Sequence, residues 1–219
     1  MILDGILNEL QSNNIVTREK AAVYINKVSR GNWTAANKDW LTDTRTISIL
    51  IDAIEQETDE KILLELVNTI GNISQRYEYY NPKILNVLIP LYDSPSINIQ
   101  VEACAKSIQF NDPRTWNAIC KIFEKKTTKN TNLSLGLYIA RYANNILKEF
   151  IDKLSNLIEN AFLKEKNIDA KDNLLLALGK VGNKKTIGFI NEQVIKKETD
   201  SLLIERANQT IKDITERLK

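Results

Sequence analysis

The side chains that most often perform acid–base or metal chemistry are sparse in this sequence. Its 219 residues include no histidine, which removes the commonest general base and metal ligand and excludes Ser-His-Asp and Cys-His arrangements. The two cysteines, Cys104 and Cys120, lie in apolar stretches and lack a metal-binding or redox spacing. We therefore interpret both as small core residues, because a free cysteine packs like a hydrophobic side chain.

The carboxylate pairs and the one glycine-rich stretch also favour structural roles. Asp59-Glu60 and the pair Asp169 and Asp172 fall at expected helix starts, where negative charge complements the helix dipole. Neither GxGxxG nor GxxxxGK[ST] occurs. Gly182 follows an expected helix, and we predict a left-handed glycine cap there. We expect no catalytic residue, cofactor, metal or small-molecule substrate. We therefore expect that the protein is not an enzyme.

The elements that position these residues are predicted to be helices throughout. Apolar residues recur at the helical spacing i, i+3, i+4 and i+7, and the scarcity of glycine and proline, seven and four residues, argues against tight β-turns. Thr17 is predicted to be an N-cap. The thirteen expected helices cover residues 2–12, 17–29, 34–41, 43–56, 59–75, 82–92, 95–110, 113–125, 130–144, 147–164, 169–181, 184–197 and 200–218.

Six segments repeat along the chain, which predicts stacked helix pairs in place of a bundle. They are REKAAVYINKV (18–28), LLELVNTIGNI (63–73), VEACAKSIQFN (101–111), NLSLGLYIARY (132–142), KDNLLLALGKV (171–181) and IERANQTIKDI (204–214). Small or apolar residues at the fourth and fifth positions let adjacent helices approach closely. The eighth residue is always aliphatic and is predicted to be buried between repeats: Ile25, Ile70, Ile108, Ile139, Leu178 and Ile211.

The repeated segments resemble HEAT-like repeats, most closely in NLLLALGKVGNKKTIGFI at 173–190. The resemblance implies an all-α, right-handed α-solenoid of about six antiparallel helix pairs, forming a single domain over residues 1–219. It also implies that the second helix of each pair lines a concave face. Irregular repeat lengths leave a tetratricopeptide array or a plain helical bundle as alternatives.

The third, sixth and tenth positions of each segment are predicted to face that concave surface and to bind a partner. These eighteen positions hold six basic and two acidic residues, which favours a partner with an acidic surface, although an ordinary solvated helix face is the plainer interpretation. The charge is also uneven along the chain, with 11 Lys and Arg against 15 Asp and Glu in residues 1–120, and 19 against 13 afterwards. The predicted partner-binding residues are Lys20, Lys27, Asn68, Asn72, Lys106, Phe110, Arg141, Lys180 and Arg206.

The loop RYEYY at 76–80 is a second candidate contact. Tyr77, Tyr79 and Tyr80 offer rigid apolar area with a polar tip, which suits a protein-binding hot spot. The alternative is that two of them pack over the helices of their own loop.

Two functional classes follow from these patterns. The first is a non-catalytic protein-binding module, either an adaptor or an immunity protein that neutralises a cognate toxin. The second is a nucleic-acid binder resembling the alkylpurine DNA glycosylases with HEAT-like repeats, which use aromatic residues and a carboxylate in a basic groove. Trp33, Trp40, Trp116 and Asp112 are the available side chains of those types, although Asp112 suits a helix cap better.

The sequence also bears on location. The N-terminal segment MILDGILNELQ lacks the basic region of a signal peptide. No stretch approaches the ~20 apolar residues of a membrane span. We therefore expect a cytoplasmic protein without a membrane segment.

Overall fold

The computed structural model describes residues 2–31, 34–125, 127–143 and 146–219. Secondary structure in these ranges is entirely helical, which confirms the predicted all-α fold class. No helix in the described ranges is long and apolar enough to cross a membrane. The chain divides into two compact units, Met1–Phe110 and Asn111–Lys219. That all 219 residues act as a single domain stays a prediction.

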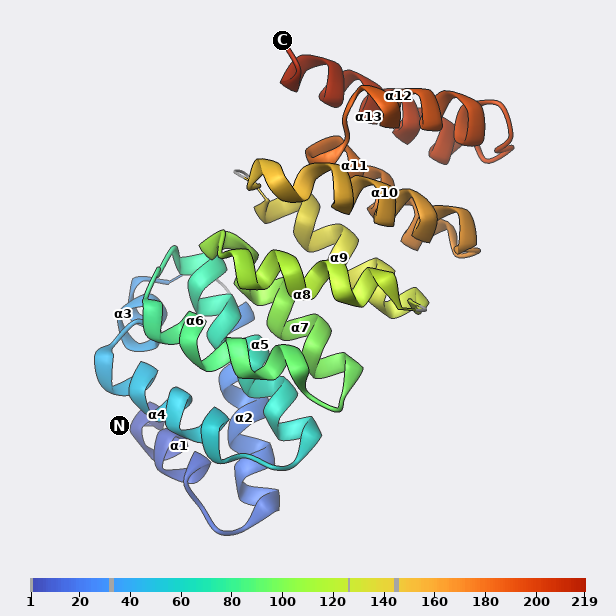
Figure 1. Cartoon of the computed structure of the whole chain (residues 1–219). Coiled ribbons are helices and arrows are strands. Elements are labelled where there is room, and N and C mark those ends of the chain that lie inside the picture. Colours follow the sequence, from blue (N-terminus) through green and yellow to red (C-terminus); the bar gives the residue numbers. More distant parts are fainter. Residues whose placement is uncertain (1, 32–33, 126, 144–145) are drawn as a thin grey trace. The chain divides into compact units, whose positions relative to one another are not determined.

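Unit 1 consists of two helical layers and one additional helix. One layer contains α2 (Ile15–Arg30), α5 (Glu60–Tyr77) and α7 (Ile97–Ser107), with α5 packed between its two neighbours (Figure 1). The other layer contains α1 (Ile2–Leu10), α4 (Thr44–Gln56) and α6 (Pro82–Leu88). α6 continues as the 3-10 helix η1 (Ile89–Asp93), and α7 continues as η2 (Ile108–Phe110). The predicted extra helix is α3 (Ala35–Leu41), which contacts α2 and α4.

Unit 2 repeats the same two-layer arrangement. Its second helices are α9 (Lys129–Tyr142), α11 (Ile168–Val181) and α13 (Ser201–Arg217), and α11 packs against both of the others (Figure 1). The opposite layer contains α8 (Pro113–Glu124), α10 (Lys148–Lys164) and α12 (Lys184–Phe189). α12 runs on into a π-helical stretch, η3 (Ile190–Ile195). The two units together hold the six predicted helix pairs.

Polar side chains set most helix starts, as the sequence indicated. Asp43, Asp59 and Asp112 each accept backbone N–H groups of the first turn that follows them, which satisfies donors that have no partner inside the helix. The predicted N-cap at Thr17 is wrong, because Asn14 accepts from the backbone of Val16 and Thr17 instead. The predicted left-handed conformation of Gly182 is also wrong, since its φ of −62° lies in the ordinary region.

The aligned core positions are confirmed with one partial exception. Ile25, Ile70, Ile108, Ile139 and Leu178 are all buried, whereas Ile211 is half-buried. The fourth-position residues are buried in all six segments: Ala21, Leu66, Cys104, Leu135, Leu174 and Ala207. The repeat register read from the sequence is therefore the register of the packed helices.

Gly136 shows why small residues recur where second helices meet. A Cβ atom at Gly136 on α9 would lie 2.9 Å from the backbone C and O atoms of Asn173 on α11. That distance is shorter than a carbon atom tolerates. Only glycine therefore permits the observed separation of α9 and α11.

A recurring glutamate joins successive second helices, and it was not predicted from the sequence. The glutamate stands two residues before the N-cap of a second helix, in the segments ETD (57–59), EKN (165–167) and ETD (198–200). Its carboxylate binds the fourth residue of the preceding second helix. The three pairs are Arg18 with Glu57, Asn132 with Glu165, and Lys171 with Glu198.

The same carboxylate also orders its own loop. Glu57 Oε2 accepts from Arg18 Nε at 2.8 Å, while Oε1 accepts from the backbone N–H groups of Thr58 and Asp59, both at 3.0 Å. Burial acts to raise the pKa of Glu57, but the hydrogen bonds from Arg18 and the backbone outweigh it, so the pKa lies below its ordinary value. The charged form of Glu57 therefore stabilises the contact between α2 and α5.

Candidate binding groove

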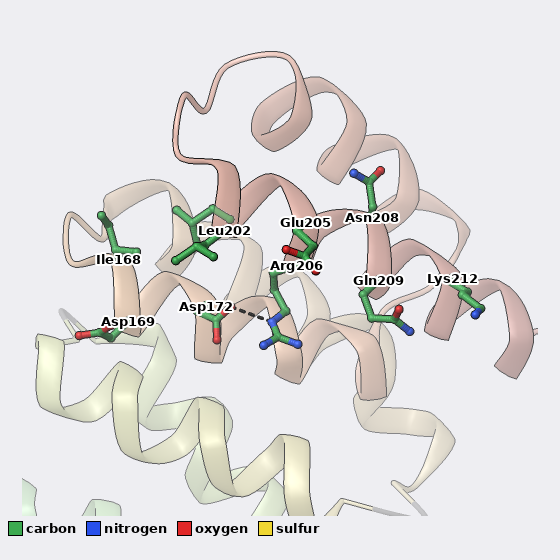
Figure 2. Close-up of a pocket in the computed structure, with 10 residues that line it drawn as sticks. Ile168, Asp169, Asp172, Leu202, Glu205, Arg206, Asn208, Gln209 and Lys212 are labelled. Atoms are coloured by element: carbon green, nitrogen blue, oxygen red, sulfur yellow. Dashed lines mark hydrogen bonds and ion pairs between the residues drawn. The ribbon is translucent and has the colours of Figure 1, made fainter.

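A recess lies in unit 2, between α11 and α13. It has a volume of about 620 Å³, and Figure 2 shows α13 and α11 forming its two sides. We call it the α11–α13 groove. Its lining residues are Ile168, Asp169, Asp172, Leu202, Leu203, Glu205, Arg206, Asn208, Gln209 and Lys212.

The groove exists because α13 is amphipathic and lies on α11 by one face. Leu203, Ala207 and Ile214 are fully buried on that face. The hydroxyl of Thr210 donates to the backbone carbonyl of Leu175 on α11 at 3.1 Å. The residues between these positions, which include Arg206 and Gln209, are consequently turned toward the groove.

One end of the groove is apolar. Ile168 begins α11 and Leu202 lies in the first turn of α13, and their side chains stand at the same end of the groove in Figure 2. They are 46% and 68% exposed, so both present apolar surface to water at one recess. An apolar group from another molecule would remove both from water.

The middle of the groove is spanned by an ion pair. Arg206 Nε lies 2.7 Å from Asp172 Oδ1, and the two side chains are 35% and 30% exposed. Figure 2 shows Arg206 reaching from α13 across to Asp172 on α11. The pair therefore fixes the guanidinium within the groove.

The charge of the groove differs from the sequence expectation of a basic surface. Three carboxylates line it, those of Asp169, Asp172 and Glu205, against the two cations Arg206 and Lys212. The expectation of a basic surface rested on the third, sixth and tenth positions of each repeated segment, and none of the three carboxylates occupies such a position. The α11–α13 groove therefore does not favour an acidic partner, and for the rest of the second-helix face that expectation stays a prediction.

A second, smaller recess lies along the same helices. Its volume is about 360 Å³, and its lining includes Leu176, Lys180 and Asp213, which were predicted to face outward from α11 and α13. Arg206 and Gln209, predicted in the same way, line the α11–α13 groove. Two of the predicted residues of these helices thus line the α11–α13 groove and three line the smaller recess, while their role in binding stays a prediction.

The remaining predicted contacts divide by exposure. Lys20, Lys27 and Arg141 are exposed, and Asn68 and Phe110 are half-buried. These five positions remain available as surface residues within their own units. Asn72 and Lys106 are buried, so their assignment to an exposed stripe is wrong.

Lys106 lies in a buried polar chain between α2, α5 and α7. Its Nζ donates to Asn72 Oδ1 at 3.0 Å, and Asn72 Nδ2 donates to Asn26 Oδ1 at 3.2 Å and to Ser29 Oγ at 3.1 Å. The Lys106 stem occupies the space where a side chain at position 71 would stand, so Gly71 makes room for it. A lysine at this helix position is ordinarily solvated, and only the close packing over a glycine covers it.

Burial has a measurable consequence for this lysine. Loss of solvation lowers the pKa of Lys106 to about 8, although Glu102 acts in the opposite direction. The positive charges of Arg30 and Arg76 lower the pKa further. Lys106 is therefore a charge held in unit 1 at a cost in stability.

The tyrosine loop is only partly a surface feature. Tyr77 is buried, Tyr79 is half-buried, and Tyr80 is 60% exposed with its ring edge-on to Phe110 at 6.2 Å. Glu78 adopts a left-handed conformation with φ of 54°, which ends α5 and redirects the chain. The assignment of Tyr77 to an exposed contact is wrong, whereas Tyr80 remains accessible.

Asp112 and Trp116, two of the side chains of the types that a glycosylase site would use, have structural roles. Asp112 caps α8 and pairs with Arg114 at 2.8 Å. Trp116 is completely buried and donates to Asn111 Oδ1 at 2.9 Å. Trp40 is half-buried, and Trp33 lies outside the described residues. The cap interpretation of Asp112 is confirmed.

Among the residues that the structure describes, no group of three or more His, Cys, Asp and Glu side chains is placed to hold a metal ion. Cys104 and Cys120 are free and buried, and burial raises the pKa of both thiols. The two cysteines are core residues, as predicted.

The fold is that of the α-solenoid repeat proteins. No protein-family model matches the sequence, and no curated protein matches it. Solved structures do match over nearly the whole chain, among them engineered and natural helical-repeat proteins. At identities below one fifth, these matches establish the fold alone.

Three of the matching structures illustrate the likeness. An engineered protein from a structural genomics consortium is 17% identical, covers 98% of each chain and has a TM-score of 0.73. A designed armadillo repeat protein in complex with the peptide (KR)4 is 15% identical, covers 97% of this chain and 99% of its own, and has a TM-score of 0.68. An archaeal HEAT-like repeats protein from Thermococcus onnurineus NA1 is 16% identical, covers 99% and 88%, and has a TM-score of 0.60.

Proposed function

We propose that this protein acts by binding another protein and not by catalysis, and that the α11–α13 groove receives part of that partner. The observation that carries the proposal is the apolar end of the groove, where Ile168 and Leu202 expose large aliphatic side chains beside a polar, charged floor. Binding sites commonly combine an apolar anchor with a few placed polar groups. A single exposed leucine is ordinary, but two such residues at one recess are a reason for a partner.

The likeness to repeat proteins supports the same class of function. Stacked repeats present long surfaces that suit macromolecular partners. One matching structure, the designed armadillo repeat protein, holds a peptide. A nucleic-acid partner is less well supported, because the groove has one more carboxylate than cation and phosphate backbones require the reverse.

Two specific roles, an adaptor and an immunity protein, are compatible with this proposal. An adaptor and an immunity protein both act by occupying a surface of another protein. We place the protein in the cytoplasm, where the free thiols of Cys104 and Cys120 would stay reduced. If the partner is a toxin, co-expression of this protein should restore growth to cells that produce the toxin. An adaptor would have no such effect.

Affinity capture with matched variants tests the proposal. The tagged wild-type chain, Leu202→Asp and Leu163→Asp would be used to recover partners from the source cells. Leu163, at the end of α10 and 55% exposed, is a comparable leucine outside the groove. We expect Leu202→Asp to reduce recovery of the specific partner by at least about tenfold, and Leu163→Asp to leave it unchanged.

Other outcomes would contradict the proposal. Equal recovery with wild type and Leu202→Asp would place the contact away from the groove. Recovery that disappears after nuclease treatment would favour the nucleic-acid alternative. Binding of the purified partner would then be measured by calorimetry to confirm that the contact is direct.

A further inference from the structure

The ion pair in the α11–α13 groove leaves specific hydrogen-bonding groups unused. Arg206 contacts Asp172 only through Nε, at 2.7 Å from Oδ1. A guanidinium has five N–H donors, and within the described part of the chain the four on the two Nη atoms of Arg206 bind no other group. The second carboxylate oxygen of Asp172, Oδ2, likewise accepts no hydrogen bond from the described residues.

These unused groups form a donor beside an acceptor. Figure 2 shows the Arg206 guanidinium and the Asp172 carboxylate side by side between the two helices, with Arg206 held by its ion pair. A residue in an extended peptide presents its own N–H and C=O on the same edge of the chain. The N–H suits Asp172 Oδ2, and the C=O suits an Nη group of Arg206.

The apolar end of the groove provides a second contact point on the same ligand. Side chains of an extended peptide alternate between its two faces. A peptide held by its backbone at Asp172 and Arg206 can therefore direct a neighbouring aliphatic side chain toward Ile168 and Leu202. Those two residues are the exposed aliphatic side chains of the groove.

The charges of the groove limit which peptides fit. Asp172 and Arg206 neutralise each other, which leaves Asp169 and Glu205 against Lys212. An acidic side chain in the peptide would meet a net excess of negative charge. A neutral, aliphatic segment meets no such repulsion.

We infer that the α11–α13 groove recognises an extended segment of its partner that carries an aliphatic side chain and no acidic residue, with one backbone residue read by Asp172 and Arg206. The inference rests on the proposed function and specifies the ligand of the same groove. It predicts that the contact is made to the peptide backbone and is therefore insensitive to most side-chain changes at that residue.

Selection from a random peptide library displayed on phage, with the full chain as bait, provides the test. We expect the enriched sequences to share an aliphatic residue and to lack Asp and Glu near it. A synthetic peptide with the enriched sequence should lose affinity by at least about tenfold when one particular backbone nitrogen is methylated. Methylation of other backbone nitrogens should have smaller effects.

Protein variants locate that contact. Arg206→Lys keeps the positive charge but removes the two Nη groups, and it should lower the affinity for the peptide by about tenfold. Leu202→Asp should weaken it similarly, and Leu163→Asp should not. Thermal melts followed by circular dichroism would show that each variant remains folded. Lys212→Met, on the same helix, controls for loss of a cation elsewhere in the groove.

The failures of the two proposals are distinguishable. Enrichment of acidic sequences that depend on Arg206 would overturn the inference in favour of a carboxylate ligand. No enrichment on the wild type, or no effect of any backbone methylation, would also overturn it. In either case, capture of a protein partner that depends on Leu202 would leave the proposed function standing.

Discussion

Replacing Lys106 with methionine should make the protein more stable at neutral pH, because it removes a buried charge without emptying its site. Lys106 is 1% exposed and lies over Gly71 between α5 and α7. Methionine has a similar length and an unbranched, flexible chain, so it can fill the same space. The hydrogen bond from Nζ to Asn72 Oδ1 is lost.

The magnitude follows from the pKa of Lys106. It is about 8 in the folded protein against an ordinary 10.5, and each unit corresponds to about 1.4 kcal/mol, so the protonated lysine destabilises the fold by about 3 kcal/mol at pH 7. Loss of the hydrogen bond offsets about 1 kcal/mol of this. We therefore expect the variant to gain about 2 kcal/mol at pH 7.

The pH dependence has a definite sign. The unfolded chain binds the Lys106 proton more tightly than the folded chain, so protonation favours unfolding. This penalty is fully present below the folded pKa of about 8 and disappears as the pH rises toward the unfolded value. Between pH 7 and pH 10 the stability difference between the two proteins should shift by about 2.5 kcal/mol in favour of the wild type.

Urea denaturation followed by far-UV circular dichroism at these two pH values measures the effect. Using the difference between the two proteins cancels the titration of groups that they share. Lys27→Met, at an exposed lysine of α2, should change stability by less than about 0.5 kcal/mol at either pH. A Lys106→Met variant that is less stable than wild type at pH 7, with a difference that does not change with pH, would refute the reasoning.

Three further predictions concern buried carboxylates and helix packing in the repeats, and the last of them has a matched control. Glu57→Gln should cost about 1–3 kcal/mol at pH 7, because the Glu57 carboxylate is 3% exposed and binds Arg18. Since the pKa of Glu57 is lowered in the folded protein, this cost should shrink in urea titrations as the pH falls through that lowered pKa. A cost that persists in acid would be inconsistent with an ionic contact. Glu159→Gln should stabilise the protein at pH 7, because Glu159 Oε1 is buried without a hydrogen-bond partner in the described residues and burial raises the pKa of Glu159, with Thr186 partly opposing this. The gain in stability should shrink as the pH falls through that raised pKa. No gain in thermal melts at pH 7 would argue for a solvated carboxylate. Gly136→Ala should cost about 1–3 kcal/mol of stability in the same denaturation assay by forcing α9 and α11 apart. The control Gly188→Ala, where a Cβ meets nothing within 4 Å, should be neutral or slightly stabilising. Equal effects of the two substitutions on stability would refute the conclusion that α9 and α11 meet closely at Gly136.

The repeat architecture was predictable from the sequence because helix periodicity and capping are local properties. Asp43, Asp59 and Asp112 cap helices at the positions that their spacing indicated. The aliphatic eighth position of each segment identified the packed face, since a helix that stacks on two neighbours must bury the same side of every repeat. Thr17 failed as a cap because Asn14, three residues earlier, already supplied the acceptor.

Part of the candidate site was also accessible from the sequence. Arg206 and Gln209 were assigned to the outward face of α13 by their register, and both line the α11–α13 groove. Asp172 was assigned only to a helix start, and Ile168 and Leu202 were not singled out. Aliphatic residues in a first helical turn give no sequence signal that separates an exposed side chain from a buried one.

The sequence by itself determined the helices, their pairing and the buried stripe, because each depends on residues within a few turns of one another. The tertiary structure alone decided which polar residues meet water. Lys106 and Asn72 have the spacing of surface residues, yet both are buried. Lys106 is covered because Gly71 on α5 leaves room for its aliphatic stem, and its Nζ donates to Asn72. Arg206 has the same spacing and stays half-exposed, because Asp172 on the neighbouring helix holds its guanidinium within an open groove.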